Sequence, residues 1–261
     1  MELIKNIIGN FFQNNFYLKK NLIIERMEID FIFSRLIKKK KLKILDIGAH
    51  HGEFLDIFSN LKFAKIRQSF EIFCFEPFGA NFNIIKKKVN YLNSNIKANI
   101  YNFAISNKTE KKFFYVGSSD TLVSCEDRWL KNFKNEFLNY KKILMQCFSF
   151  KDFITEYKFN IYNEIDLLKI DAEGHDFIVL NDILQNNLII NSIMIEFDTK
   201  DLSATKDIIK YLKLKKFIKI FIFGRSGIST SYIGEYTNNY NLLKIFNKNN
   251  ITSGNLVAFK S

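Results

Sequence analysis

The sequence contains few of the residues that break or stiffen a chain. Its 261 residues include one proline, ten glycines and one tryptophan. No stretch rich in proline, glycine or serine divides the chain, and no repeat is apparent. Hydrophobic residues make up 47% of the composition, which argues against disorder and is ample for a buried core. We therefore predict one large domain, with a decorated N-terminal end.

Cysteines and long apolar runs are also scarce. Cys74, Cys125 and Cys147 form no CxxC pair, so they indicate neither a disulfide framework nor a zinc site. No apolar run approaches the roughly 20 residues of a spanning helix. The polar residues Glu2 and Lys5 leave no room for a signal-peptide core at the N-terminus. The sequence thus predicts a cytoplasmic protein without a transmembrane segment.

Arginine is rare although the formal net charge is +12. The excess is almost all lysine, and the arginines are Arg26, Arg35, Arg67, Arg128 and Arg225. Phosphate and base recognition favours arginine forks, so we predict no dedicated nucleic-acid binding. The abundance of lysine, asparagine, isoleucine and phenylalanine also fits an AT-rich genome. An anionic lipid surface or a polysaccharide stays open as a partner of the lysine-rich surface, and so does peripheral association with a membrane.

Short apolar segments alternate with segments of helical periodicity along most of the chain. The expected strands are residues 42–47, 71–76, 99–105, 165–170, 191–197, 217–223 and 255–260. The expected helices are residues 52–62, 79–90, 175–186 and 203–215. Strands separated by helices predict an α/β fold with a mostly parallel sheet and right-handed crossovers.

Two segments depart from this alternation. Residues 1–41 read as a helical extension, which could pack on a partner subunit of a homo-oligomer, and residues 42–261 as the domain itself. Residues 106–150 read as an insertion. Its expected elements are strands 111–116 and 143–148 and a helix over 126–140, followed by a helix at 151–157.

The first candidate site follows the first expected strand, in the run from Asp46 to Gly52. Gly48 and Gly52 allow a tight turn and a close approach of the backbone to a ligand. Between them lie Ala49 and His50. The glycines are four residues apart, unlike the dinucleotide fingerprint G-x-G-x-x-G. An ordinary strand-to-helix turn is the alternative.

The second candidate is Glu76, followed by the single proline, Pro77. A carboxylate at the end of the second strand can accept hydrogen bonds from both hydroxyls of a ribose. Alternatively, Glu76 caps the helix expected at 79–90, since proline is tolerated at a helix start.

The third candidate is the run from Asp171 to Asp176, where titratable groups crowd the end of a strand. It includes Glu173 and His175. Such crowding shifts pKa values and marks candidate catalytic sites. Carboxylates and imidazole are also metal ligands, but no HExxH-like spacing occurs, and we predict no metal. His175 as a helix cap or surface residue is the alternative.

Together these motifs resemble those of the FkbM-type methyltransferases. The resemblance rests on Asp46 with its glycine turn, Glu76-Pro77, Asn102-Phe103-Ala104, the run Lys169–His175, and Glu196. It covers about residues 42 to 198. The usual turn of the family reads D-x-G-A-N-x-G, whereas His50 stands here in place of the asparagine.

The resemblance implies a Rossmann-like class I fold of about seven strands that binds S-adenosyl-L-methionine and methylates a hydroxyl, mostly on sugars or secondary metabolites. Gly48, Ala49, His50 and Gly52 would wrap the methionine end of the cofactor. Asp46 would orient this turn or reach the amino group. Glu76, with Pro77, would hold the ribose, Asn102 and Ala104 would border the adenine, and Asp171 would lie beside the transferable methyl group.

Methyl transfer to a sugar hydroxyl benefits from a general base. We predict His175 for this role, because imidazole titrates near neutral pH, with Asp171 or Glu173 orienting it or acting as the base. The acceptor is expected under the insertion. Its candidate contacts are Ser118, Ser119, Asp120, Thr121, Arg128 and Trp129.

Three other functions remain open at this stage. A nicotinamide-dependent oxidoreductase would also use Glu76, but it should show the missing G-x-G-x-x-G. A non-catalytic, cofactor-binding scaffold of a glycan-assembly complex would use the lysine surface. Nucleic-acid methylation is disfavoured, since no N/D-P-P-Y/F motif occurs.

Overall fold

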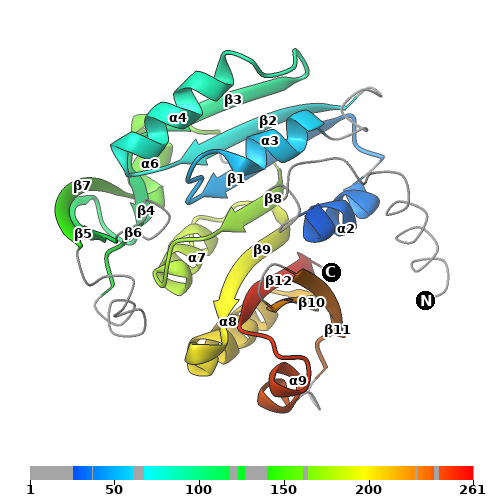
Figure 1. Cartoon of the computed structure of the whole chain (residues 1–261). Coiled ribbons are helices and arrows are strands. Elements are labelled where there is room, and N and C mark those ends of the chain that lie inside the picture. The colour runs from blue at the N-terminus through cyan, green and yellow to red at the C-terminus, as the bar shows by residue number, and fades with distance from the viewer. Residues whose placement is uncertain are drawn as a thin grey trace.

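The computed structural model describes residues 26–36, 38–60, 68–117, 123–126, 140–160, 164–226, 229–237 and 241–260. Its elements form a layered α/β fold (Figure 1), in which helices lie on both faces of a large twisted sheet. No helix among the described residues is long and apolar enough to cross a membrane.

Within the described residues, the main sheet has eight strands. They are β1 (Lys41–Ile47), β2 (Ser69–Phe75), β3 (Ile96–Tyr101), β8 (Ile165–Ile170), β9 (Ile190–Asp198), β10 (Phe217–Ser226), β11 (Ser229–Glu235) and β12 (Ser253–Lys260). Their order is β11-β10-β12-β9-β8-β1-β2-β3. The neighbours from β9 to β3 are parallel. By contrast, β12 is antiparallel to both β9 and β10, and β11 is antiparallel to β10. The expected mostly parallel, Rossmann-like sheet is confirmed, with β11 as an additional edge strand.

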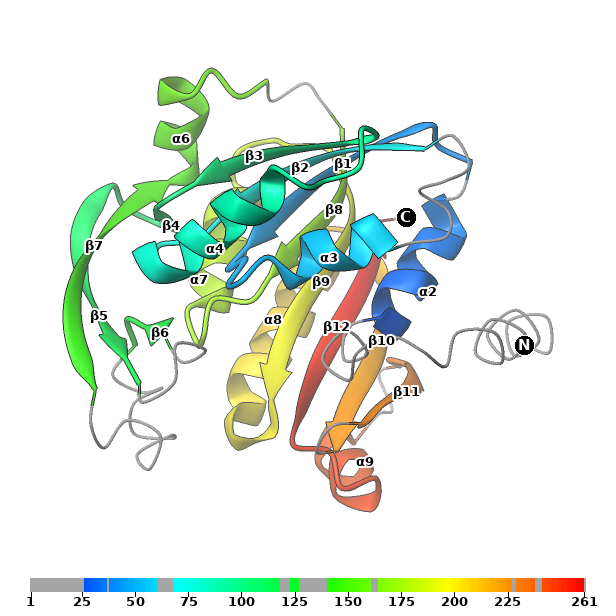
Figure 2. The same cartoon turned by 45° about the horizontal axis from the view of Figure 1, so that its top comes forward.

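Each face of this sheet is covered by its own group of helices (Figure 2). The helices α2 (Arg26–Leu36), α3 (Glu53–Asn60) and α4 (Gly79–Val89) pack on one face. The helices α6 (Phe150–Glu156), α7 (Asp176–Leu184), α8 (Leu202–Leu214) and α9 (Leu242–Lys248) pack on the other. A short 3₁₀ turn, η3 (Thr199–Asp201), precedes α8.

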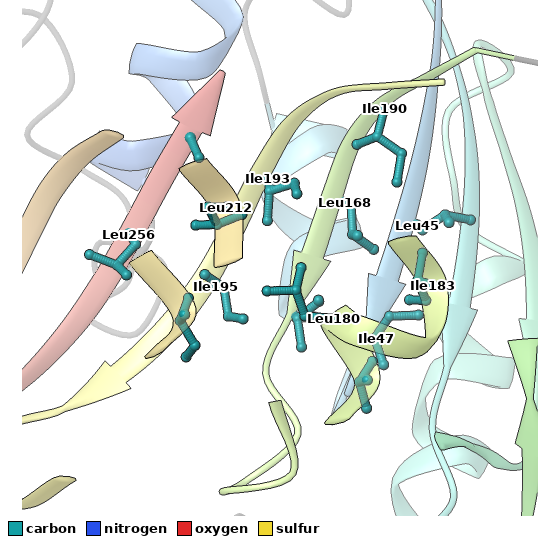
Figure 3. Close-up of a cluster of buried hydrophobic side chains, with 14 of the residues drawn as sticks. Leu45, Ile47, Leu168, Leu180, Ile183, Ile190, Ile193, Ile195, Leu212 and Leu256 are labelled. Atoms are coloured by element: carbon teal, nitrogen blue, oxygen red, sulfur yellow. The ribbon is translucent and has the colours of Figure 1, made fainter. Parts of the chain in front are cut away.

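The core follows from the two-residue period of the strands. In β1, Leu42 and Ile44 join the cluster on the α3 side, whereas Leu45 and Ile47 join the cluster on the α7 side. In Figure 3, Leu180 and Ile183 of α7 lie against this second side of the sheet. Because apolar residues point to both faces, the central strands are buried and hold their carboxyl ends in fixed positions.

A second, smaller sheet lies beside the carboxyl ends of the main strands (Figure 1). Its strands are β4 (Ala104–Ser106), β5 (Glu110–Val116), β6 (Val123–Ser124) and β7 (Lys141–Ser149), in the order β4-β7-β5-β6. The expected strands at 111–116 and 143–148 are thus confirmed as the antiparallel pair of β5 and β7.

The single strand expected over 99–105 was wrong. The chain leaves the main sheet after Tyr101 and enters the small sheet at Ala104. Between them, the Asn102 side chain donates to the backbone oxygens of Glu76 and Pro77, at 2.9 and 3.1 Å. These two bonds tie the turn to the end of β2, and the backbone then continues into the small sheet.

The N-terminal and C-terminal parts differ from expectation in detail. Helix α2 confirms helical structure within residues 1–41, and its residues Ile29 and Ile32 are fully buried in the core. The sequence analysis missed β11 and α9. The helix expected over 126–140 lies almost entirely outside the described residues.

Candidate functional site

A cavity lies where the strand order of the main sheet reverses. The chain proceeds from β1 outward to β2 and β3, and it returns through β8 on the opposite side of β1. Such a switch point leaves a crevice at the carboxyl ends of the strands. The cavity there has a volume of about 470 Å³, which is within the range of small-molecule sites, roughly 300–1,000 Å³.

The cavity brings together most of the candidate site residues. Its lining includes Gly48, Ala49, His50, Glu76, Pro77, Ala104, Asp171, Glu173 and His175. Asp46, Gly52 and Asn102 are not part of the lining. Residues that the sequence analysis did not select also line it, among them Glu53, Ser106, Cys125, Lys169 and Arg225.

The glycine turn after β1 needs residues that tolerate positive φ. Gly48 has φ +75°, and a Cβ atom built on it would lie 1.8 Å from the backbone oxygen of Asp171. Only glycine therefore fits between the ends of β1 and β8. His50 has φ +46°, a left-handed conformation in which asparagine and histidine are both enriched. This shared preference explains how His50 can stand where the family has asparagine without changing the turn.

Glu76 lies at the end of β2, facing the turn. Its side chain is buried, and it accepts hydrogen bonds from the backbone N–H groups of His50 and Phe78, at 2.8 and 2.9 Å. Burial raises the pKa of Glu76 to about 7, although these bonds oppose the shift. A buried carboxylate on a cavity wall, with lone pairs left on both oxygens, can accept hydrogen bonds from ligand hydroxyls.

Asp46 lies beneath the turn, with no exposed surface. One oxygen, Oδ1, is 3.3 Å from Nζ of Lys169, which also donates to the backbone oxygen of Gly48 at 2.9 Å and lies 3.6 Å from Oδ2 of Asp171. Burial raises the pKa of Asp46, while Lys169 opposes the shift. Of the two roles left open for Asp46, this position favours orienting the turn, and Lys169 is the buried cation that joins the ends of β1 and β8.

The turn after β8 also has an unusual backbone. Glu173 and Gly174 have φ values of +48° and +90°. The carboxylate of Asp176 fixes them, because it accepts bonds from the backbone N–H groups of Ala172 and Gly174, at 2.8 and 3.0 Å. Non-glycine residues with positive φ cost energy and occur where surrounding structure enforces them. The turn thus holds Glu173 and His175 against the cavity.

His175 is buried, and both of its ring nitrogens have partners. Nδ1 lies 2.6 Å from Oε1 of Glu126, and Nε2 lies 2.9 Å from Oγ of Ser106. Burial lowers the pKa of His175, but its interactions with Cys125 and Glu126 outweigh burial and raise the pKa to about 9. This pKa lies above the near-neutral value expected of an imidazole in the sequence analysis.

Some predicted residues cannot be placed, and others lie at the margin. Ser118, Ser119, Asp120, Thr121, Arg128 and Trp129 all lie outside the described residues.

Glu196, at the end of β9, is paired with Arg225, whose Nη1 is 2.9 Å from Oε1 of Glu196. Burial raises the pKa of Glu196 well above its ordinary value, while Arg225 opposes the shift. Arg225 also lines the cavity.

Comparisons with known proteins identify a family for most of the chain. A family model described as "Methyltransferase FkbM domain" matches residues 46–219. No curated protein matches. Similar solved structures include the methyltransferase FkbM from Methylobacillus flagellatus KT, at 12% identity and a TM-score of 0.47 over 84% of this chain and 44% of that one. Another is the N-terminal domain of human METTL16 in complex with SAH, at 14% identity and a TM-score of 0.46 over 90% and 70% of the two chains.

The chain thus spans less than half the length of the FkbM structure that it resembles. The family match itself extends from Asp46 of the glycine turn through the β8 segment and past α8, and so contains both turns that line the cavity. Since it spans more than half of the sequence, the chain belongs to the FkbM methyltransferase family.

Proposed function

We propose that this protein is an S-adenosylmethionine-dependent O-methyltransferase that methylates a hydroxyl of a sugar in surface polysaccharide or glycolipid biosynthesis. The observation that carries the proposal is one cavity with two different walls. One wall holds the glycine turn and the buried Glu76. The other holds Ser106 and His175, and Glu126, which is outside the lining, binds the second ring nitrogen of His175.

The first wall fits the cofactor. Gly48 lets the turn pack directly against the backbone of Asp171 at the cavity, because a Cβ there would lie 1.8 Å from the Asp171 oxygen. Glu76 would accept hydrogen bonds from the ribose hydroxyls, and the turn from Gly48 to Gly52 would wrap the methionine end. Ala104 lines the cavity and would border the adenine, while Asn102 acts through the backbone of Glu76 and Pro77. When bound, the cofactor supplies an electrophilic methyl group.

The second wall suits removal of a proton from a hydroxyl. With His175 neutral and Nδ1–H donating to Glu126, Nε2 accepts the hydroxyl hydrogen of Ser106. An acceptor hydroxyl could then pass its proton to Oγ of Ser106 as the proton of Ser106 moves to Nε2. The carboxylate of Glu126 stabilises the resulting imidazolium. General-base assistance of this type contributes roughly 10²–10⁴-fold.

The raised pKa of His175 has a consequence for this role. At neutral pH most of the protein holds the imidazolium, which cannot accept a proton. Turnover should therefore rise with pH, reach half of its maximum near pH 9 and level off above it. A pH profile that is flat between 6 and 9 would remove His175 as the base and leave Asp171 or Glu173, which also line the cavity.

The partners and location belong to the same proposal. We expect a small-molecule or glycan acceptor rather than a nucleic acid, since the chain has only five arginines. The free thiols of Cys74, Cys125 and Cys147 agree with a reducing, cytoplasmic setting. Peripheral contact with a membrane and assembly into a homo-oligomer remain expectations from the lysine content and the N-terminal segment.

The test is a calorimetric titration with S-adenosylhomocysteine, with NAD as the control ligand. Wild-type protein should bind S-adenosylhomocysteine in the micromolar range, and Glu76→Gln should weaken binding at least about tenfold, because an amide replaces an acceptor of charge-assisted hydrogen bonds. The matched control is Glu156→Gln, an exposed carboxylate on α6. Binding of NAD alone, or equal binding by both variants, would overturn the cofactor assignment.

Acceptor chemistry is tested next, with the labelled cofactor and a panel of methyl hexosides and heptosides. Methyl transfer to one of them, abolished in Glu76→Gln, would support the sugar acceptor. Transfer only to RNA or to a protein substrate would replace it.

A further inference from the structure

The small sheet turns a mixed apolar and basic surface away from the cavity. Side chains alternate along a strand, so β5 and β7 each direct one set inward and the other outward. The inward set includes Phe114 and Cys147, which are buried and line the cavity. The outward set consists of three cross-strand pairs: Phe113 with Leu144, Tyr115 with Lys142, and Lys111 with Gln146. These six residues and Tyr140, which directly precedes β7, are called the outer face below.

The apolar residues of the outer face are exposed and connected to one another. Phe113 and Leu144 are each 49% exposed, and Tyr140 is 50% exposed. The rings of Tyr115 and Tyr140 meet edge to face, with centroids 5.1 Å apart. Nζ of Lys142 lies 4.5 Å from the ring centroid of Phe113 and 5.7 Å from that of Tyr115. The residues therefore form one patch, and a contiguous exposed apolar patch of this kind marks an interaction surface.

The charge of the outer face selects an anionic partner. Its charged members are Lys111 and Lys142, and none of its residues is acidic. The contact of Lys142 with the rings leaves its N–H groups able to donate to phosphate oxygens. Apolar side chains that reach the acyl boundary, together with lysines at the headgroups, attach proteins to anionic bilayers. We propose that the outer face binds the surface of a membrane that contains anionic lipids.

A glycan fits this surface less well. Phe113 and Leu144, at its centre, offer no hydrogen bonds to hydroxyls. The amide of Gln146 already donates to the backbone oxygens of Glu110 and Cys147, at 3.3 and 2.8 Å. Most of the polar contacts that a sugar needs beside a stacking ring are therefore missing from the outer face.

A second copy of the chain also fits less well. In a symmetric dimer the same patch of both subunits meets. Lys111 and Lys142 of one copy would then face the lysines of the other, with no carboxylate of the outer face to compensate them. Like charges held opposite one another destabilise such a contact.

Docking through this face would also orient the cavity. Figures 1 and 2 show β5 and β7 at one end of the molecule, beside the carboxyl ends of the main strands. Because Phe114 and Cys147 line the cavity from the inner side of the same two strands, a bound membrane would lie one sheet layer away from it. The inference rests on the outer face alone and does not depend on methyl transfer.

The test is cosedimentation with vesicles of phosphatidylcholine and phosphatidylglycerol, with pure phosphatidylcholine vesicles for comparison. Wild-type protein should bind the mixed vesicles and bind the neutral ones much more weakly. The double variant Lys111→Gln/Lys142→Gln should weaken binding to mixed vesicles by about tenfold or more, because each lysine near an anionic surface contributes about fivefold. Phe113→Ser/Leu144→Ser should weaken it by about tenfold or more, since it removes the apolar contact.

Helix α9 supplies matched controls. Lys244 and Lys248 are exposed there, and Leu243 is 54% exposed. Lys244→Gln/Lys248→Gln and Leu243→Ser should leave vesicle binding nearly unchanged. If both lysine pairs weaken binding equally, the attraction belongs to the overall charge of +12, and the assignment to the outer face is overturned.

A second measurement uses the wild type and so does not depend on the folding of variants. Lysines are acetylated with and without mixed vesicles, and the sites are quantified by mass spectrometry. The vesicles should protect Lys111 and Lys142 but not Lys244 and Lys248. Uniform protection, or no binding of wild type to mixed vesicles, would overturn the proposal. Binding to dextran sulfate instead of vesicles, or self-association abolished by Phe113→Ser/Leu144→Ser, would replace the membrane by a polyanionic glycan or a second copy.

Discussion

Replacing Glu126 by glutamine should change the charge of the buried His175. The wild-type imidazole has a pKa of about 9 against an ordinary 6.5, a difference worth about 3 kcal/mol in favour of the cation. Burial of the ring opposes the cation, whereas Cys125 and the carboxylate of Glu126, which lies 2.6 Å from Nδ1, both favour it. In Glu126→Gln the amide can still accept the bond from Nδ1–H, but it carries no charge. The pKa of His175 should therefore fall by about 1 or more, with Cys125 retaining its share.

The assay is an NMR titration of the imidazole signals between pH 5 and 10. The protein has only three histidines, so His175 can be assigned with one substitution, His175→Gln. Cys125→Ser measures the share of the thiol, which also favours the cation. If that variant lowers the pKa as far as Glu126→Gln does, the role belongs to Cys125. A wild-type His175 that titrates near 6.5, or a pKa unchanged in Glu126→Gln, would refute the reasoning.

Replacing Glu126 by glutamine should also lower the unfolding free energy, by an amount that depends on pH. A histidine whose pKa is raised in the folded state contributes stability that is fully present below pH 6.5 and is lost as the pH rises through about 9. The wild type should thus exceed Glu126→Gln in unfolding free energy by about 1–3 kcal/mol at pH 6, and the difference should shrink by pH 10. Urea denaturation at the two pH values measures it.

Two further substitutions test the turns. Lys169→Met should lower the unfolding free energy by about 3 kcal/mol or more, because it leaves Asp46 buried without its cation. Adding Asp46→Asn to this variant should restore part of the lost stability. If the effects of the two substitutions are instead additive, the pairing of Lys169 with Asp46 is contradicted. Gly48→Ala should cost at least about 2 kcal/mol, since its Cβ would overlap the oxygen of Asp171. The matched Gly79→Ala, with open space around it in the first turn of α4, should be neutral or stabilising by up to about 1 kcal/mol. Equal effects of the two glycine substitutions in urea denaturation would refute the steric argument.

The sequence predicted the parallel half of the sheet well, for a physical reason. Its strands are short apolar runs buried on both faces, such as Ile165–Ile170, and such runs stand out between helical segments. The strand Ser229–Glu235 was missed because it lies at the edge of the sheet with polar residues on both sides. A strand without a buried face has no hydrophobic alternation to detect.

The sequence likewise predicted some residues of the candidate site and missed others. The glycine turn, Glu76 and the run from Asp171 to His175 are contiguous motifs, and the fold brings them to one cavity. Ser106 and Glu126 were missed, because they lie 69 and 49 residues from His175 in the sequence. Each lies beside other polar residues of the insertion, so nothing in the sequence marks it, and only the folding of the insertion brings it to the imidazole.

This division assigns different roles to the two walls of the cavity. The residues that would hold the cofactor lie in loops that follow buried strands of the main sheet. In these loops a substitution can clash with the backbone, as a side chain at Gly48 would clash with Asp171. The two partners of His175 lie elsewhere: Ser106 is in the small sheet and Glu126 follows its strand β6. The core of this sheet holds only a few buried side chains, including Phe114 and Met145. A smaller core tolerates sequence change with less effect on the main fold. Differences in acceptor and in proton transfer should therefore arise in the small sheet, while the cofactor wall stays the same.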